Sequence, residues 1–570
     1  MKNLEIAKVL YEIADLLELN EVQYKPRAYR RAAQNIEMLS EDIETLYRVG
    51  KLDDIPGVGK SIAVKIQEYL EEGELKYLNE LRSQVPQGFQ ELLKIEGIGP
   101  KTAQILYKAG GIKNIHELES AIKKGKLEDI KGFGKKKESN LLQAIELYKT
   151  SQERFLLGEI LPIAKIIKSI LEKSKFVINL EFAGSIRRRK ETVGDIDLLV
   201  VSKQPLEVME VFTKLPERKQ ILSSGEMKST IILNNNIQVD LTIIDESSYG
   251  SALQYFTGSK EHNIQLRELA KKSNMKLNEF GLFNLLDDKK IAGAKETEIY
   301  EKLGLSYIPP ELRENRGEID LAKMNKLPEL IELKDIKGDM HVHTKWSDGT
   351  NSIEEMAIFA KRLGYNYIAI CDHSKTLQIA GGLNENDLQN QIAEIERINR
   401  KLEDFRIFSG TEVNIDSDGN LDLNNSILKD LDFVVASIHS GFKQEEQVLI
   451  KRILNAMNND YVNCIGHPSG RIINKRAPSI TNFSQVFEEA EKLKVFLEIN
   501  AFPDRLDLSD LNCFKARSYQ ILLSIDSDAH NFNQLNFMDF GVSVARRGWL
   551  ENKYVLNTKS LNEINKILNL

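Results

Sequence analysis

Histidines are concentrated in the second half of this sequence, where acids accompany them. The stretch MHVHTKWSDG contains His341, His343 and Asp348, and six of the eight histidines follow residue 340. Other members of the group end short apolar runs; they are His373, Glu412, His439, His467, Asp528 and His530. Mixed imidazole and carboxylate ligands suit Zn²⁺, Mn²⁺ or Fe²⁺ better than Mg²⁺. The group predicts a metal centre that activates water for phosphoester hydrolysis, whereas any single member could be a hydrogen-bonded core residue.

A second group of acids lies in the first half. Asp195 and Asp197 are two residues apart in GDIDLLV, and Asp240 occurs in IQVDLTII. Both segments are typical of strands, so the first two carboxylates share a face and we expect Asp240 on a neighbouring strand. Converging carboxylates repel one another unless cations hold them, and Mg²⁺ shares such ligands with substrate phosphates. The pattern predicts two-metal phosphoryl transfer; solvated acids at a strand end are the alternative.

The residues before these acids are suited to binding a triphosphate. The segment AGSIRRRK contains Gly184, which permits close approach of the backbone, and Ser185, whose hydroxyl can bond a phosphate oxygen. The cations that follow, Arg187 to Lys190, can hold further phosphate oxygens.

Three short segments near the N-terminus repeat one design. They are IPGVGK (55–60), IEGIGP (95–100) and IKGFGK (130–135), each followed by helical periodicity. Two glycines allow a tight turn and leave backbone N–H groups free at the next helix, where a phosphate can bind. The predicted phosphate contacts are Gly57, Gly59, Lys60, Gly97, Gly99, Lys101, Gly132 and Gly134.

Different elements must position the two groups of acids. Strand-like segments follow residue 155, residues 262–275 are helical, and residues 307–339 are polar and interrupted by prolines, as in a linker. Seven strand-like segments then alternate with helical ones, which predicts a parallel α/β barrel. In such barrels the site lies at the C-terminal strand ends.

Composition sets broad limits. The 570-residue chain has a formal net charge of −7, which argues weakly against nucleic-acid binding, but RRRK (187–190) and KKGKLEDIKGFGKKK (123–137) are concentrated basic patches. The three cysteines suggest no disulfide framework, and the N-terminus is typical of an amphipathic helix rather than a signal peptide. We expect a cytoplasmic protein that does not span a membrane.

Residues 1 to about 315 resemble the family X DNA polymerases (DNA polymerase beta-like) through AGSIRRRKETVGDIDLLV, QVDLTII and YFTGSKEHNIQLRELA. The resemblance implies that Asp195, Asp197 and Asp240 hold two catalytic Mg²⁺ ions. It places Gly184, Ser185, Arg188 and Gly194 at the triphosphate, and Arg267 at the template. The wall around sugar and base would comprise Tyr255, Phe256, Gly258 and Asn263. The hairpins at Ile55–Val58 and Ile95–Ile98 would grip DNA backbone with a monovalent cation.

Two positions bear on details of this resemblance. Lys65 occupies the place of the family's lyase nucleophile, although Ser61 replaces a second basic residue there and Lys60 stands beside it. Lys65 could equally be an ordinary surface lysine. Lys260 stands where some relatives carry an acid that packs on the incoming base, which affects nucleotide affinity and not the reaction type.

Residues 338–570 resemble the PHP (polymerase and histidinol phosphatase) domain. All nine positions of its trinuclear site are present: His341, His343, Asp348, His373, Glu412, His439, His467, Asp528 and His530. The resemblance implies up to three Mn²⁺ or Zn²⁺ ions. Arg471 is expected within reach of substrate phosphate, although a structural salt bridge is an alternative role for it.

The expected fold is multidomain: helical helix-hairpin-helix domains, an α+β nucleotidyltransferase palm and a distorted (β/α)7 barrel. The expected boundaries are 1–80 (lyase-like), 81–150 (helix-hairpin-helix), 151–250 (palm), 251–315 (nucleotide and template binding), 316–337 (linker) and 338–570 (PHP).

The expected function is a monomeric DNA polymerase that fills short gaps in base-excision repair, using primed or gapped DNA and deoxynucleoside triphosphates. It is fused to a PHP nuclease, expected to be a Mn²⁺-dependent 3′→5′ exonuclease that could also cut at abasic sites. The first alternative is a phosphatase for a small phosphomonoester, with a catalytically weak, DNA-binding polymerase half. The second is a non-catalytic DNA scaffold.

Overall fold

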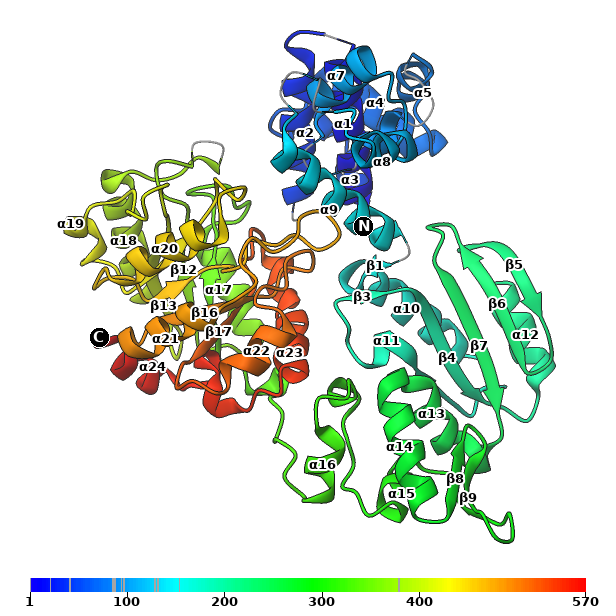
Figure 1. The fold of residues 1–570 in the computed structure, drawn as a ribbon. Helices are drawn as coiled ribbons and strands as arrows, with labels where there is room; N and C mark the ends of the chain where they lie inside the picture. Colours follow the sequence, from blue (N-terminus) through cyan, green and yellow to red (C-terminus); the bar gives the residue numbers. More distant parts are fainter. Residues whose placement is uncertain are drawn as a thin grey trace.

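The computed structural model describes residues 2–20, 22–39, 43–84, 89–93, 95, 98–127, 130, 133–152, 154–377 and 380–570. A helical N-terminal region lies above a palm sheet, and a barrel lies beside that sheet (Figure 1). Two of the predicted hairpin glycines, Gly97 and Gly132, fall outside the described residues. Within the described part of the chain, no helix is both long and apolar enough to cross a bilayer.

The N-terminal region is built from amphipathic helices around its own apolar core. Its core side chains recur at helical spacing, as in Ile6, Leu10, Ile13 and Leu17 of the first helix. The helices are α1 Lys2–Leu19, α2 Lys25–Met38, α3 Ile43–Arg48, α4 Lys60–Glu72, α5 Lys76–Ser83, α6 Phe89–Leu92, α7 Pro100–Gly110, α8 Ile115–Lys123 and α9 Lys135–Gln152.

The palm is a five-stranded sheet with strand order β2-β4-β7-β6-β5. Its strands are β2 Asn179–Phe182, β4 Asp195–Val201, β5 Arg218–Ser224, β6 Lys228–Leu233 and β7 Gln238–Ile244, packed against α10 Leu157–Glu172 and α12 Pro205–Thr213. A two-stranded ladder, β1 Phe155–Leu156 with β3 Thr192–Val193, precedes β4. Strand β5 was not expected; all seven of its residues are exposed, so it lacks the alternating burial that marks a strand in sequence.

A smaller thumb follows the palm. It contains α13 Tyr249–Thr257, α14 Lys260–Lys272, α15 Glu296–Lys302 and a sheet of β8 Met275–Asn278, β9 Gly281–Asn284 and β10 Lys290–Ala292. The segment 316–337, expected as a linker, carries helix α16 (Glu318–Lys323) and buries Ala322 and Ile331. Glu318 accepts backbone N–H bonds and lies 2.7 Å from the His262 ring on α14, so the segment is packed and does not act as a free spacer.

The predicted seven-stranded parallel barrel is confirmed, with strand order β11 to β17. Its strands are β11 Gly338–Val342, β12 Tyr367–Ile370, β13 Arg406–Asn414, β14 Phe433–Ser437, β15 Cys464–Ile465, β16 Phe496–Asn500 and β17 Leu523–Asp526. A single parallel bridge, Val342 to Ala529, joins the first and last strands and nearly closes the barrel. The main surrounding helices are α17 Ile353–Arg362, α18 Glu385–Asn399, α20 Glu446–Met457, α21 Ser484–Leu493, α22 Asp510–Ala516, α23 Met538–Arg547 and α24 Leu561–Leu568.

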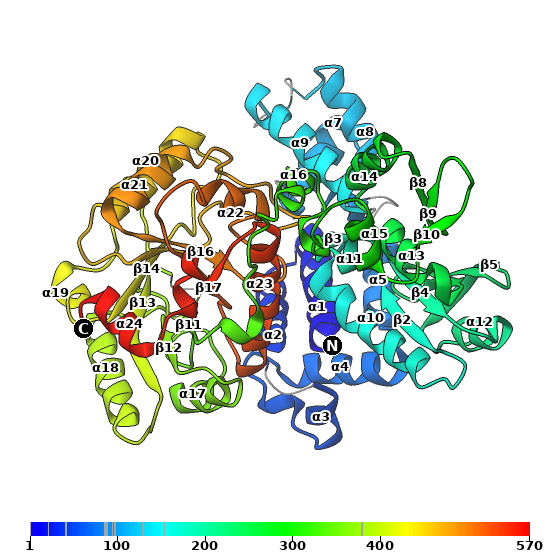
Figure 2. The same cartoon turned by 90° about the horizontal axis from the view of Figure 1, so that it is seen from below.

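The barrel is packed directly on the polymerase-like half. Helix α23 lies on the side of the barrel that faces the palm and thumb (Figure 2). Trp549, just after α23, is buried in the thumb core, and Pro503 of the barrel packs on Gly158 of α10, where a Cβ would come within 2.3 Å. Because palm and barrel side chains form one continuous apolar cluster, the two modules make a fixed contact.

Candidate active sites

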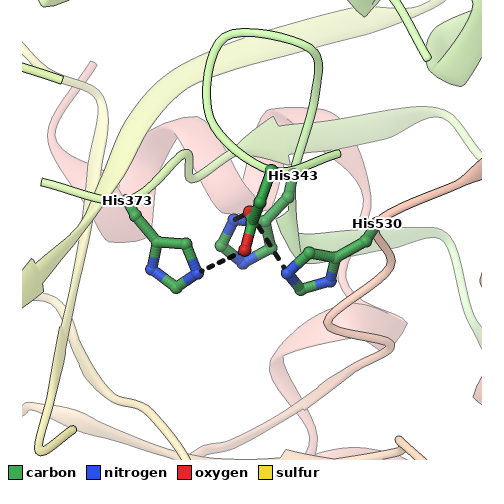
Figure 3. Close-up of side chains that lie close together, drawn as sticks. His343, His373 and His530 are labelled. Carbon is green, nitrogen blue, oxygen red and sulfur yellow. Dashed lines mark ion pairs between the residues drawn. The ribbon is translucent and has the colours of Figure 1, made fainter. Parts of the chain in front are cut away.

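All nine expected ligands in the barrel gather at the C-terminal ends of its strands. Three overlapping sets have ligand atoms within 4.8 Å of one another: His343, Asp348, His373 and His530; His341, His343 and Asp528; and His373, Glu412 and His439. Figure 3 shows the rings of His343, His373 and His530 around one carboxylate, which belongs to Asp348. His467 joins the group because its Nε2 lies 3.1 Å from Glu412 Oε1.

Glu412 is the centre of this cluster. Its Oε1 lies 3.2 Å from His439 Nε2, and its Oε2 lies 2.8 Å from His373 Nδ1. The same Oε2 is 3.6 Å from His341 Nε2 and 3.7 Å from His343 Nε2. Glu412 is 1% exposed and lies on β13, a strand that pairs with β14. A carboxylate in this position can bridge adjacent cations.

The pKa values in the cluster are pulled apart. Burial, together with the neighbouring His530 and His373 rings, lowers the pKa of His343 to about 4. Burial opposes protonation of His373 as well, but the Glu412 and Asp348 carboxylates raise its pKa to about 10. Burial would raise the pKa of Asp348, yet His530 and His373 hold it far below its usual range. The low pKa of Asp348 and the raised pKa of His373 have one cause: ionised carboxylates stabilise positive charge on the groups beside them.

The donor set fits divalent cations. His341 Nε2 and His343 Nε2 face each other at 3.1 Å in a buried site, a geometry that a shared cation would favour. The Nδ1 atoms of His343 and His467 are buried without a hydrogen-bond partner. Buried polar atoms are normally satisfied, and imidazole nitrogen with carboxylate oxygen is the donor combination of Zn²⁺ and Mn²⁺ sites.

Two residues that support these ligands were not predicted from the sequence. Glu498 on β16 lies 2.7 Å from His341 Nδ1 through its Oε1, and its Oε2 accepts the backbone N–H of His467. Asn500 donates to both Glu498 and Asp528. Such partners fix the orientation and tautomer of metal-binding histidines. The available signal was an acid inside the apolar run VFLEINA, where a buried charge needs a partner.

A different arginine from the expected one lies beside the ligands. The Arg471 guanidinium donates to Glu191 and to the carbonyls of Arg505 and Leu506. Of the two roles considered for Arg471, these contacts fit the structural salt bridge. Arg505 Nε instead lies 3.8 Å from Asp528 Oδ2, and its side chain is 26% exposed. Arg505 therefore combines proximity to the ligands with access to solvent.

The three palm acids lie on adjacent strands. Strand β4 pairs with β7 in parallel, with Asp197 directly opposite Asp240, and Asp195 shares their face. Burial, followed by repulsion from Asp195 and Asp240, raises the pKa of Asp197 to about 7. Among the described residues, these acids do not form a set with oxygen atoms all within 4.8 Å. Cations would hold these mutually repelling carboxylates together, and Mg²⁺ is the cation that such oxygen ligands favour.

The expected triphosphate residues surround the acids. Gly184 has φ of +56°, and a Cβ there would lie 2.1 Å from Asp197 Oδ2, so the turn accepts only glycine beside this carboxylate. Ser185 Oγ is buried without a hydrogen-bond partner. Arg188 donates to the Thr257 carbonyl and lies against Gly258, while Gly194 directly precedes β4.

The expected nucleotide wall is held together internally. The rings of Tyr255 and Phe256 meet edge to face at a centroid distance of 5.3 Å. Asn263 is 9% exposed; it donates to the Tyr255 carbonyl and accepts from Gln254, so its amide holds α13 against α14. Arg267 is exposed on α14, one turn beyond Asn263.

The described residues of the three hairpins share one backbone hydrogen bond. In each, an N–H bonds back to the carbonyl three residues earlier: Val58 to Ile55, Ile98 to Ile95, and Phe133 to Ile130, at 2.9–3.0 Å. The following helices begin beside Gly59, Gly99 and Gly134, whose carbonyls accept the first helical bonds. Lys60 and Lys101 are exposed at the first turns of α4 and α7, so the bare N–H groups and a cation lie together.

Lys65 lies on α4 in the first helical domain. Its Nζ donates to the Ser61 carbonyl and hydroxyl at 3.2 Å and lies 4.8 Å from the centre of the Tyr77 ring. Burial, followed by the positive charge of Lys25, lowers the pKa of Lys65.

Comparisons with family models match the N-terminal helices, the thumb and the barrel. A helix-hairpin-helix domain model matches residues 1–75, a SAM-like helix-hairpin-helix tandem matches 89–146, a DNA polymerase beta thumb matches 252–314 and a PHP domain matches 339–501. Together with the palm and the barrel, these matches define a polymerase core of the beta type joined to a PHP domain.

Individual relatives extend this result. The DNA polymerase/3′-5′ exonuclease PolX of Bacillus subtilis (strain 168) is 39% identical over 571 residues, which cover 100% of this chain and 99% of the relative. DNA polymerase lambda of Rattus norvegicus is 26% identical over 342 residues, 55% of this chain and 56% of the relative. A probable phosphatase of Thermoanaerobacter sp. (strain X514) is 32% identical over 231 residues, 39% of this chain and 89% of the relative. The chain belongs to the PolX family of family X DNA polymerases, and this family implies divalent metal ions at both modules.

Proposed function

We propose that the protein adds deoxynucleotides to a primer 3′-OH in short DNA gaps, as in base-excision repair, and that its barrel degrades DNA from the 3′ end. The observation that supports this best is the presence of two separate groups of expected ligands in one chain. One is the oxygen-only set around Asp197 and Asp240, and the other is the imidazole-rich set around Glu412.

In the polymerase module, Asp195, Asp197 and Asp240 would hold two Mg²⁺ ions, which when bound activate the primer hydroxyl and stabilise charge on the phosphates. Ser185 and Arg188 would bind triphosphate oxygens, beside the backbone of Gly184 and Gly194. Tyr255 and Phe256, with Gly258 and Asn263, would enclose the sugar and base and exclude a ribose 2′-OH by crowding. Arg267 would contact the template.

In the barrel, the nine ligands would hold up to three Mn²⁺ or Zn²⁺ ions, which when bound lower the pKa of a water and polarise a phosphodiester. Glu498 would orient His341. Arg505, rather than Arg471, would bind the phosphate of the scissile strand because its guanidinium is nearer the ligands. A 3′→5′ exonuclease is the main proposal, and cutting at abasic sites is a further activity of the same centre.

The N-terminal helices would bind the DNA backbone at Gly57, Gly59, Lys60, Gly99, Lys101 and Gly134, with a monovalent cation on the hairpin carbonyls. Lyase chemistry at Lys65 is supported by its lowered pKa, because a neutral amine is the form that attacks an abasic sugar. A monomeric state and a cytoplasmic location remain predictions.

The test uses a labelled gapped duplex. With Mg²⁺ and deoxynucleotides, the wild-type protein should lengthen the primer; with Mn²⁺ and no nucleotides, it should shorten it from the 3′ end. A protein that releases phosphate from small phosphomonoesters but never extends the primer would contradict the proposal in favour of the phosphatase alternative. A metal-loaded protein that binds the duplex but performs neither reaction would favour the scaffold.

A further inference from the structure

The barrel contacts the segment that presents the proposed triphosphate residues. This segment, Arg187–Glu191, runs from the Gly184 turn toward β3 and then Asp195. Three of its residues meet barrel side chains: Arg188 O accepts from Arg547 Nη1 at 2.8 Å, Arg189 Nη1 lies 3.3 Å from Asp539 Oδ2, and Glu191 Oε2 accepts from Arg471 Nη2 at 2.7 Å. The barrel thus fixes both the backbone and the side chains of this polymerase segment.

Arg547 makes the contact that reaches furthest into the polymerase site. It is 3% exposed on α23, and the same Nη1 that binds Arg188 O also lies 3.0 Å from Glu314 Oε1. Glu314 Oε1 in turn accepts from Arg188 Nε at 3.1 Å. Arg547 therefore holds the main-chain carbonyl of Arg188 and the carboxylate that restrains the Arg188 side chain. Its Nη2 is anchored on Asp510 at 2.8 Å.

The position of Arg188 makes this contact relevant to nucleotide binding. Its guanidinium lies against Gly258, 3.0 Å from where a Cβ would stand, and also acts on Asp197 electrostatically. If Arg188 paired with Glu314 alone, the full negative charge of that carboxylate would compete with a triphosphate for the guanidinium. Arg547 shares the carboxylate, so Arg188 is held in place while its positive charge stays available.

We propose that Arg547 of the barrel is a positioning residue of the polymerase site, acting through Glu314 and the Arg188 carbonyl to orient the Arg188 guanidinium toward the terminal phosphate of the nucleotide. This inference rests on the proposed polymerase function. It makes the PHP domain part of the polymerase's nucleotide-binding apparatus, independently of its own chemistry.

The test compares Arg547→Ala with wild type in the full-length protein, using primer extension at varied nucleotide concentration. The KM for the deoxynucleoside triphosphate should rise about tenfold, because one charge-assisted contact is lost, while kcat should change little. Preference for a triphosphate over the corresponding diphosphate as a competitive ligand should fall by a similar factor. A structural defect remote from the phosphates would not change that preference.

Arg546→Ala is the matched control. Arg546 neighbours Arg547 on α23 and is bound to Glu311 and the Ile331 carbonyl, so its loss weakens the same interface without touching Arg188. It should leave the triphosphate preference unchanged. Exonuclease activity of each variant reports whether the barrel is folded. Arg547→Lys, which keeps the buried charge, should give an intermediate KM and serves as the readout if Arg547→Ala does not fold.

A double-mutant cycle with Arg188→Ala separates positioning from a general effect, because in that background Arg547→Ala should add almost nothing to KM. An equal rise in KM in both backgrounds, or an unchanged triphosphate preference in both Arg547 variants, would overturn the inference while leaving the polymerase function intact. A wild-type protein that does not extend primers would overturn both.

Discussion

The palm and barrel sites both gather ligands that are apart in the sequence, but they hold them by different forces. In the barrel, carboxylates lie among the imidazoles and attract them: Glu412 lies within 3.7 Å of the His341, His343, His373 and His439 rings and also contacts His467. In the palm, every ligand is an acid, and burial, followed by repulsion from Asp195 and Asp240, raises the pKa of Asp197 to about 7. The mixed set closes on itself, whereas the all-acid set needs cations to close.

Burial differs in the same direction. His341 and His343 are completely buried at strand ends, while Asp195, Asp197 and Asp240 are only half-buried on one face of the inner palm strands β4 and β7. A more deeply buried centre suits resident ions, and a more open face suits ions that arrive with a nucleotide and leave with its pyrophosphate. The comparison shows that ligand chemistry, as well as ligand position, determines whether the ligands of a metal site lie close together before the metal binds.

The largest expected effect is the separation of the two activities. Asp197→Asn should reduce primer extension by at least about 10³-fold, because a carboxylate shared by the metals is worth several kcal/mol to the transition state. His343→Asn should reduce 3′ degradation by a similar factor. Each variant should retain the other activity, measured on the same labelled duplex. Parallel loss of both activities in either variant would show that the centres are not independent.

A smaller effect is expected from the support beneath the barrel ligands. Glu498→Gln removes the charge that orients His341 and should weaken metal binding by about 10–100-fold. Titration of the metal-free protein with Mn²⁺ measures this directly. Glu563→Gln is a control on the barrel surface, where the carboxylate only caps α24. Unchanged Mn²⁺ affinity in Glu498→Gln would show that the His341 ring is oriented by other contacts.

The repulsion among the palm acids should be visible in stability. In metal-free protein, Asp197→Asn should raise the free energy of unfolding by about 1–3 kcal/mol at pH 8. The pKa of Asp197 is raised from 3.8 to about 7, so the folded wild type binds an extra proton between these values and gains stability as pH falls. The advantage of the variant should therefore shrink from pH 8 toward pH 4. Chemical denaturation in EDTA at several pH values tests this, and a pH-independent difference would contradict it.

The smallest effect concerns DNA binding at the hairpins. Lys101→Ala should weaken duplex binding modestly and reduce the log–log salt slope by about 0.9, the value for one neutralised phosphate. Lys553→Ala, a surface change on the barrel where the lysine pairs with Glu551, should leave the slope unchanged. Anisotropy titrations at several salt concentrations measure both. Equal slopes for Lys101→Ala and wild type would show that Lys101 on α7 does not contact a DNA phosphate.

Much of this organisation follows from local sequence. The DxD spacing in a β-branched run placed Asp195 and Asp197 on one strand face. The seven strand-like segments, six of which carry a predicted ligand, predicted the barrel and the strand ends where its ligands meet. Strand β5 and the support from Glu498 were not predicted. An exposed edge strand has no burial period, and a buried acid inside a strand acquires its partner from another strand far along the chain.

The sequence by itself determined which residues could bind metal and phosphate, because side-chain chemistry and strand or turn periodicity are local properties. Only the tertiary structure decided which arginine lies beside the barrel ligands, that residues 316–337 are packed, and that α23 of the barrel reaches Arg188. These depend on contacts between residues hundreds of positions apart, such as Arg547 with Arg188, and local patterns carry no information about such pairs.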